Sequence, residues 1–276
     1  MPTRISQPSH QSLFIEMQGN GHTIARGTAF VARAKIGHEF LITNRHNVTG
    51  RHQETESPLC KLTGAIPDTI VVWHNARLGL GEFVRVEVPL YKDGIPRWIE
   101  HPSYAGSVDV VALPIASNDE IALYPYCVDS LAHMRIEPSL AVNVVGFPFG
   151  ERTGASFAVW ATGFVASEPE VNHGGRPIFL IDCRARKGQS GSPVIRYHNG
   201  GGCVTHDNGV EVVGLISQFL GVYSGRINED SDLGIVWKSF IVSELLVYAS
   251  TLVPASPVIT PGNVNARQPF AVPIRL

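Results

Sequence analysis

The sequence predicts an all-β protein made of two six-stranded antiparallel β-barrels. Its apolar segments are short and rich in Val, Ile, Phe and Thr, residues that favour strands. Gly, Asn, Asp and Pro separate these segments, and helical periodicity is nearly absent. With 276 residues and 44% hydrophobic content, the chain can bury a sizeable core.

The candidate strands fall into two sets of equal size. The first set is 12–18, 22–34, 38–44, 68–75, 82–90 and 109–115. The second set is 140–147, 157–167, 177–183, 192–198, 210–219 and 233–239. The segment between them is less regular and richer in charge, which suits a crossover between two barrels. A cleft between barrels would be the natural place for a site.

The chain can be divided along these lines into one domain and a tail. Phe240, Leu245 and Tyr248 have a spacing that a terminal helix could bury on one side. The five prolines after that helix forbid a regular helix or central strand. The expected parts are an N-terminal barrel (12–115), a crossover (116–138), a C-terminal barrel (139–238), a helix (239–250) and an extended Pro-rich tail (251–276).

Charge and cysteine content narrow the expected partners and location. The 22 basic and 24 acidic residues give a net charge of −2, so no overall field recruits nucleic acid or an anionic membrane. The N-terminal stretch lacks a continuous apolar segment of the kind found in signal peptides, and no apolar run is long enough to span a bilayer. The four cysteines show no paired spacing, which favours reduced thiols and a cytoplasmic location.

The heptapeptide "GQSGSPV", residues 188–194, places a serine between two glycines and two apolar segments. A plain turn between strands would explain this composition. The alternative is a nucleophile on a tight turn, where glycine lets two backbone N–H groups point at one developing oxyanion. That alternative requires a base and a group that orients the base.

His46 and Asp109 are the candidates for these two roles. His46 in "FLITNRHNV" comes just after an apolar strand, where loops carry chemistry on a rigid scaffold. Asp109 in "DVVALPI" begins an apolar strand, whereas the other acidic residues mostly lie in polar clusters. A buried aspartate requires a partner, and an imidazole N–H would provide one.

The four motifs together resemble those of chymotrypsin/trypsin-like serine peptidases over about residues 12–250. "GTAFVA" resembles the glycine-bearing strand of that family, and "FLITNRHNV" its Thr-x-x-His segment. "DVVALPI" and "GQSGSPV" resemble its aspartate segment and its nucleophile turn, in the family's order of His, Asp and Ser. "VVGFPFG" and "ATGFVAS" are similar to the bacterial HtrA-type branch, and Ser192 to glutamyl-endopeptidase-like members.

This resemblance implies a chymotrypsin-like fold and a serine endopeptidase. Ser190 would attack a peptide carbonyl, His46 would act as general base and then acid, and Asp109 would orient the imidazole. The N–H groups of Gly188 and Ser190 would form the oxyanion hole. Gln189 replaces the aspartate that receives a new N-terminus in secreted digestive members, so activation by that route is not expected.

The resemblance also places a substrate pocket at Arg184, Ser217, Gln218, Phe219 and Gly234. A bulky Phe219 would narrow the entrance and favour small or medium aliphatic P1 residues. Arg184 leaves a second possibility open, because an inward guanidinium would select acidic P1 residues.

The remaining expectations concern cofactors and partners. Cys203 and His206 have the spacing of half a zinc site, but no second pair matches them, so no metal or other cofactor is expected. The expected partner is a protein or peptide substrate. Because an uncontrolled cytosolic protease would be hazardous to the cell, we also expect a latent cleft, a narrow substrate range or a regulatory protein partner. The alternative function is a catalytically silent module that binds a peptide or partner protein on the same fold.

Overall fold

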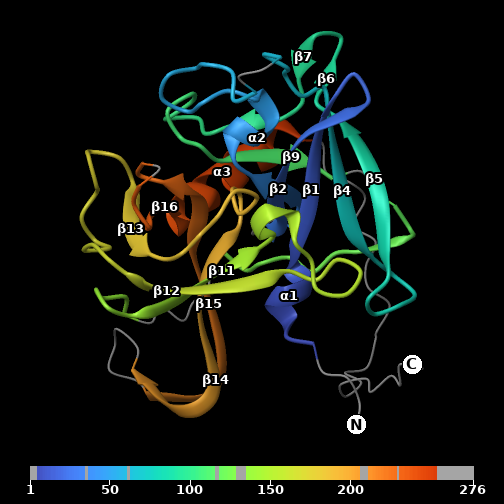
Figure 1. Cartoon of the computed structure of the whole chain (residues 1–276). Helices are drawn as coiled ribbons and strands as arrows, with labels where there is room; N and C mark the ends of the chain where they lie inside the picture. Colours follow the sequence, from blue (N-terminus) through green and yellow to red (C-terminus); the bar gives the residue numbers. More distant parts are fainter. Residues whose placement is uncertain are drawn as a thin grey trace.

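The structure is a computed structural model that describes residues 5–34, 37–60, 63–115, 118–128, 135–205, 211–228 and 230–253. Most of the expected Pro-rich tail, residues 254–276, lies outside the described residues. The described chain forms two β-rich halves side by side, with a helix near the C-terminal end of the described part (Figure 1).

The N-terminal half is an eight-stranded antiparallel sheet with the strand order β10-β4-β1-β2-β3-β9-β8, in which β5 also pairs with β4. Two of these strands, β8 and β10, have only two residues each and were not expected from the sequence. The strands are β1 (Ser12–Gly19), β2 (His22–Arg33), β3 (Glu39–Thr43), β4 (Thr69–Ala76), β5 (Phe83–Pro89), β8 (Ile99–Glu100), β9 (Val111–Pro114) and β10 (Ile121–Ala122). A separate small ribbon pairs β6 (Tyr91–Lys92) with β7 (Ile95–Pro96).

The C-terminal half is a closed six-stranded barrel with the order β11-β12-β13-β16-β15-β14. This confirms the expected chymotrypsin-like class of fold. The strands are β11 (Ala141–Gly146), β12 (Val159–Val165), β13 (Ile178–Asp182), β14 (Pro193–Thr205), β15 (Glu211–Arg226) and β16 (Leu233–Lys238). β14 and β15 are longer than expected, and together they form a hairpin that projects from the barrel (Figure 1).

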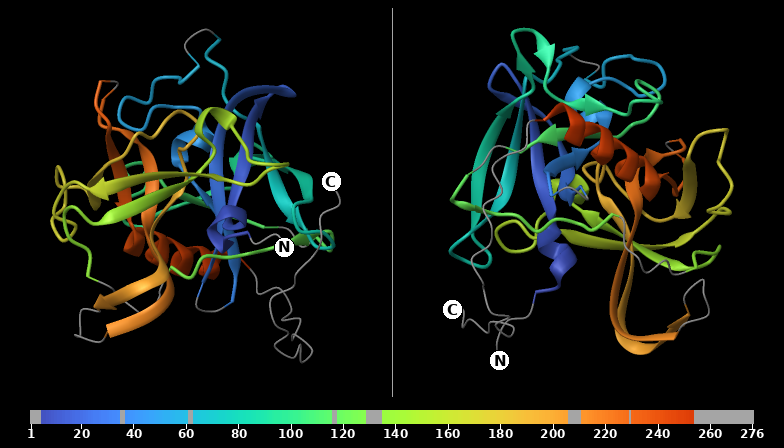
Figure 2. Two further views of the ribbon diagram at one scale, coloured as in Figure 1. Left: turned by 60° about the horizontal axis from the view of Figure 1, so that its bottom comes forward. Right: turned by 180° about the vertical axis from the view of Figure 1, so that it is seen from behind.

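Three α-helices and one 3-10 turn complete the described fold. They are α1 (Gln7–Gln11), α2 (Arg45–Thr49), the 3-10 turn η1 (Pro148–Gly150) and α3 (Ser239–Leu252). α3 confirms the expected short terminal helix; it contacts β15 and β16 of the barrel and β8 and β9 of the N-terminal half (Figure 2). No helix in the described part of the chain is long and apolar enough to cross a bilayer.

A shared apolar core joins the two halves. Phe14 and Phe30 of the N-terminal sheet belong to the same buried cluster as Phe147 and Phe219 of the C-terminal half. Phe30 and Phe219 have ring centroids 5.4 Å apart. Burying four aromatic side chains at this boundary fixes how the halves sit against each other, because such groups supply much of the packing energy of a core. Side chains from both halves can therefore meet at defined distances.

Candidate active site

α2 presents His46 at the end of a buried strand. β3 leads into Asn44, the N-cap of α2, and Gly50 ends the helix in the left-handed region with φ +65°. The Asn44 amide donates to the Asp109 carbonyl oxygen at 2.6 Å, which ties α2 to the start of β9. The His46 side chain keeps 15% of its surface exposed, enough to reach a substrate.

Asp109 is buried and accepts three hydrogen bonds. Its Oδ2 lies 2.6 Å from His46 Nδ1, and its Oδ1 accepts from the His46 backbone N–H at 2.9 Å. The hydroxyl of Ser224, on β15 of the other half, donates to Oδ2 at 2.5 Å. An ionised carboxylate only accepts hydrogen bonds, so Nδ1 carries the proton and Nε2 presents a lone pair. This is the tautomer that a general base needs.

The nucleophile turn, residues 187–191, requires glycine at two positions. Gly188 and Gly191 have φ angles of +95° and +87°, which L side chains rarely adopt. A Cβ at Gly191 would lie 2.1 Å from the Thr28 carbonyl oxygen, and one at Gly188 would lie 2.3 Å from that of Phe147. The turn therefore packs backbone against backbone, and Ser190 is half-buried at its tip.

Hydrogen-bond donors hold two backbone carbonyl groups of the nucleophile turn. The Lys187 carbonyl accepts from Phe149 N–H at 2.6 Å, and the Ser190 carbonyl accepts from Thr28 N–H at 2.9 Å. The Asn47 amide also donates to the Ser190 carbonyl at 3.2 Å, which links the turn to α2. Among the hydrogen bonds of the described residues, none uses the N–H of Gly188 or Ser190. Both amides are available to an oxyanion.

The structure brings His46 and Asp109 into direct contact, and a hydrogen bond from Asn47 of α2 to the Ser190 carbonyl links the nucleophile turn to the helix of His46. In the described part of the chain, no hydrogen bond joins Ser190 Oγ to His46 Nε2. Such bonds are often long or poorly aligned without substrate and shorten in the complex. Gln189 is fully buried, and its Oε1 accepts from Arg186 N–H at 2.7 Å, so it stabilises the turn from within.

The expected pocket residues of β15, Ser217 to Phe219, come before the part of the strand that reaches Asp109. Phe219 is 5% exposed and packs against Phe30 and Tyr126 in the core between the two halves. Gln218 is buried beside it, and Ser217 is exposed further toward the projecting hairpin. The residue that reaches Asp109 is Ser224, because β15 continues through Gly221 to Arg226 instead of ending at Phe219.

Tyr223 is the neighbour of the nucleophile turn that sequence reasoning missed. Its carbonyl accepts from Gly191 N–H at 2.9 Å, and its N–H donates to the Ser192 carbonyl at 2.9 Å. Its ring is buried against Gly234 of β16, where a Cβ would lie 2.6 Å from a ring carbon. Gly234 thus makes room for this ring. Arg184, the other expected pocket residue, is exposed.

Cys183 precedes this turn in the sequence and is buried. Burial, with Asp182 and Asp232 nearby, raises the pKa of its thiol to about 11. The thiol therefore stays protonated at neutral pH, and thiolate is the reactive form. Within the described residues, no group of His, Cys, Asp or Glu has the arrangement of a metal site, and His206 lies outside them.

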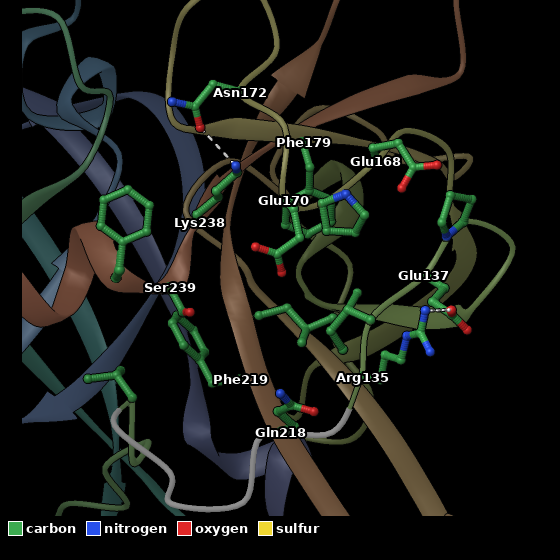
Figure 3. Close-up of a pocket in the computed structure, with 16 residues that line it drawn as sticks. Arg135, Glu137, Glu168, Glu170, Asn172, Phe179, Gln218, Phe219, Lys238 and Ser239 are labelled. Atoms are coloured by element: carbon green, nitrogen blue, oxygen red, sulfur yellow. Dashed lines mark hydrogen bonds and ion pairs between the residues drawn. The ribbon is translucent and has the colours of Figure 1, made fainter. Parts of the chain in front are cut away.

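Two cavities flank the barrels. A cavity of about 350 Å³ adjoins the nucleophile turn and is lined by Thr23–Arg26 of β2 with Phe149, Gly150, Lys187 and Gly188. A larger one of about 1050 Å³ lies between β13, β15 and the start of α3 (Figure 3). Gln218 and Phe219 line the larger cavity, together with Glu168, Glu170 and Lys238. His46, Asp109 and Ser190 do not contribute to its lining, so it is a separate feature.

Comparison with known proteins shows the family of the chain and supports its class of fold. The family model of the trypsin-like peptidase domain matches residues 27–204, more than half of the chain. The structure is similar to that of the serine endoprotease from Yersinia pestis, with a TM-score of 0.50 and 12% identity over 90% of this chain and 67% of that chain.

Two further solved structures are similar at lower scores. The inactive form of Rv3671c from M. tuberculosis H37Rv has a TM-score of 0.46 and 17% identity over 91% of this chain and 90% of that chain. The HtrA-type protease AlgW with a tripeptide has a TM-score of 0.49 and 14% identity over 87% of this chain and 60% of that chain. No curated protein matches the sequence significantly. On the family match, the chain belongs to the trypsin-like peptidases.

Proposed function

We propose that this trypsin-like peptidase is an active serine endopeptidase that forms an acyl-enzyme on Ser190. The observation that carries the proposal is the buried Asp109 carboxylate, which holds the His46 ring at Nδ1 and its backbone N–H at once. A module that only binds peptides would gain nothing from a desolvated carboxylate that fixes one imidazole tautomer. The silent binding module is therefore the weaker alternative.

The proposed chemical steps use His46 Nε2, the Ser190 hydroxyl and the two backbone N–H groups of the turn. Ser190 Oγ attacks the peptide carbonyl carbon while His46 Nε2 takes the hydroxyl proton. The N–H groups of Gly188 and Ser190 stabilise the resulting oxyanion. When the C–N bond breaks, His46 returns the proton to the leaving amine. A water molecule then attacks the carbonyl carbon of the Ser190 ester while His46 takes its proton. The acid product leaves, and His46 returns the proton to Ser190 Oγ.

The substrate main chain has a strand edge to pair with. One edge of β15 pairs with β14 as far as Val222 and then hydrogen-bonds to the nucleophile turn at Tyr223. The other edge pairs with β16 as far as Arg226. From Ser224 to Arg226, the edge of β15 that faces away from β16 makes no strand pair within the described residues. An extended peptide can add there as a further strand, which would bring its scissile carbonyl toward Ser190.

Tyr223 supports the earlier expectation of a small P1 residue, but for a different reason. Its ring fills the space above Gly234 next to the nucleophile turn, so little room is left for a large side chain. We infer that small or medium aliphatic P1 residues are accepted and that bulky or charged ones are rejected. A regulatory partner and a cytoplasmic location remain proposals that rest on the sequence.

A fluorophosphonate probe tests the proposed function. We expect covalent labelling of the wild-type chain at Ser190, with no labelling of Ser190→Ala and strongly slowed labelling of His46→Ala. Ser139→Ala, which removes an exposed serine away from the site, is the matched control and should label like the wild type. Absence of labelling in folded wild-type protein, with intact peptide binding, would favour the silent module.

A further inference from the structure

Thr28 occupies the boundary between the two halves, directly under the nucleophile turn. It lies in β2 and is fully buried. Its backbone N–H donates to the Ser190 carbonyl at 2.9 Å, and its carbonyl accepts from the Thr43 hydroxyl at 2.8 Å. One residue of the N-terminal sheet therefore touches the turn of the other half through its main chain.

The Thr28 hydroxyl makes two more hydrogen bonds in the same region. It donates to the Gly188 carbonyl at 2.9 Å and accepts from the Phe147 N–H at 3.2 Å. Both contacts are buried, so water cannot replace them easily. A threonine has one hydroxyl proton, and here that proton is committed to the Gly188 carbonyl.

This donation fixes the peptide that follows the oxyanion-hole glycine. The peptide before Gly188 is held by Phe149 N–H on the Lys187 carbonyl, and the peptide after it is held by the Thr28 hydroxyl. The C=O and N–H of a trans peptide point in opposite directions. Holding the Lys187 carbonyl therefore sets the direction of the Gly188 N–H, and holding the Gly188 carbonyl limits rotation on the other side of this glycine, which itself has a wide choice of φ and ψ.

We propose that Thr28 is a positioning residue that sets the oxyanion hole from the opposite half of the molecule. This inference rests on the proposed function. Without the hydroxyl, the peptide after Gly188 loses its only side-chain donor among the described residues and keeps the bond from Gln189 N–H to the Arg186 carbonyl at 3.1 Å. The glycine can then turn and change the spacing of the two oxyanion-hole N–H groups. Because the oxyanion exists only in the transition state, the loss falls on kcat and not on substrate binding.

The test compares Thr28→Val with Thr28→Ser. Valine keeps the shape and removes the hydroxyl, whereas serine keeps the hydroxyl and removes the methyl group. We expect Thr28→Val to lower kcat roughly 10- to 100-fold with KM changed less than about 2-fold, and to weaken a peptide aldehyde inhibitor in parallel. Thr28→Ser should keep kcat within about 3-fold of the wild type.

Ser12→Ala is the matched control, because Ser12 is buried at the same boundary and its hydroxyl donates to the Val145 carbonyl at 2.8 Å. It should lower the melting temperature and leave both kcat and aldehyde affinity unchanged. Equal kcat in Thr28→Val and wild type would overturn the role of Thr28 and leave the proposed function intact. If Thr28→Val does not fold, a loss of kcat in folded Thr28→Ser overturns it, and retention supports it. A wild type that neither labels nor hydrolyses peptides overturns the proposed function first.

Discussion

The N-terminal sheet and the C-terminal barrel hold their parts of the site by different means. In the sheet, side chains do this work, since the Asp109 carboxylate fixes the His46 ring. In the barrel, the backbone does it, since glycines and anchored carbonyls shape the turn around Ser190. At the site, each half also receives a hydroxyl from the other: Ser224 reaches Asp109, and Thr28 reaches Gly188. The site therefore depends on how the halves are aligned.

The largest effect is expected from breaking the side-chain arrangement of the N-terminal half. Asp109→Asn should lower kcat by about 10⁴-fold, the loss typical of this change in trypsin-like enzymes, because the amide favours the wrong imidazole tautomer. Folding should change little. Asp68→Asn is the control, since Asp68 Oδ2 accepts from Asn20 N–H at 2.7 Å far from His46. Wild-type activity in Asp109→Asn would remove Asp109 from the site.

A smaller effect is expected when the barrel's hydroxyl on Asp109 is removed. Ser224→Ala deletes one of three donors to the carboxylate, and a hydrogen bond to a charged group is worth about 1.5–3 kcal/mol. We expect kcat to fall roughly 10- to 100-fold in steady-state assays, far less than for Asp109→Asn. A loss of kcat as large as that of Asp109→Asn would mean that the substitution disturbs the position of β15, and does not only remove one hydrogen bond to Asp109.

The third prediction concerns substrate choice by the barrel. Tyr223→Val should open the space above Gly234 and raise the kcat/KM ratio of Phe over Val at P1 by about 10-fold, since a few methylene groups in an apolar pocket give differences of this size. Phe219→Leu, in the core away from the turn, should leave that ratio unchanged. A peptide library scored at P1 measures both. An unchanged ratio in Tyr223→Val would show that the ring does not line the pocket.

The smallest effect concerns stability of the N-terminal half in acid. Burial lowers the pKa of His74 to about 4, whereas an unfolded imidazole titrates near 6.5. Between these values the unfolded chain binds more protons, so the free energy of unfolding rises with pH by up to about 1.4 kcal/mol per unit. His74→Phe should flatten this slope in urea titrations between pH 4.5 and 6.5, and exposed His22→Gln should not. Equal slopes in His74→Phe and wild type would contradict the assignment.

The sequence was sufficient for the parts of the site that local pattern specifies. Gly188 and Gly191 mark a turn that only glycine can adopt, and Asp109 is recognisable because a carboxylate at the mouth of an apolar strand needs a partner. The class of fold followed from alternating apolar segments and turn residues. These signals are all short-range, so a single chain displays them without tertiary information.

The full course of β15 could not be predicted in the same way. The strand expected at 210–219 ends at Phe219, whereas β15 runs through Gly221 and Gly225 to Arg226. A Cβ at Gly221 would lie 1.9 Å from the Trp237 carbonyl oxygen, so this glycine serves a close approach of strands and not a turn. Thr28 and Ser224 were missed because nothing local distinguishes a threonine or serine in a strand that contacts the other half.

The central claim is that Ser190 becomes acylated with His46 as its base. Acid-quenched turnover of an activated ester, followed by intact-mass measurement and peptide mapping, tests it directly. We expect one acyl group per chain, located on Ser190 in the wild type and absent from His46→Ala and Ser190→Ala. Steady hydrolysis without an adduct, or an acyl group on Cys183 or another residue, would contradict it.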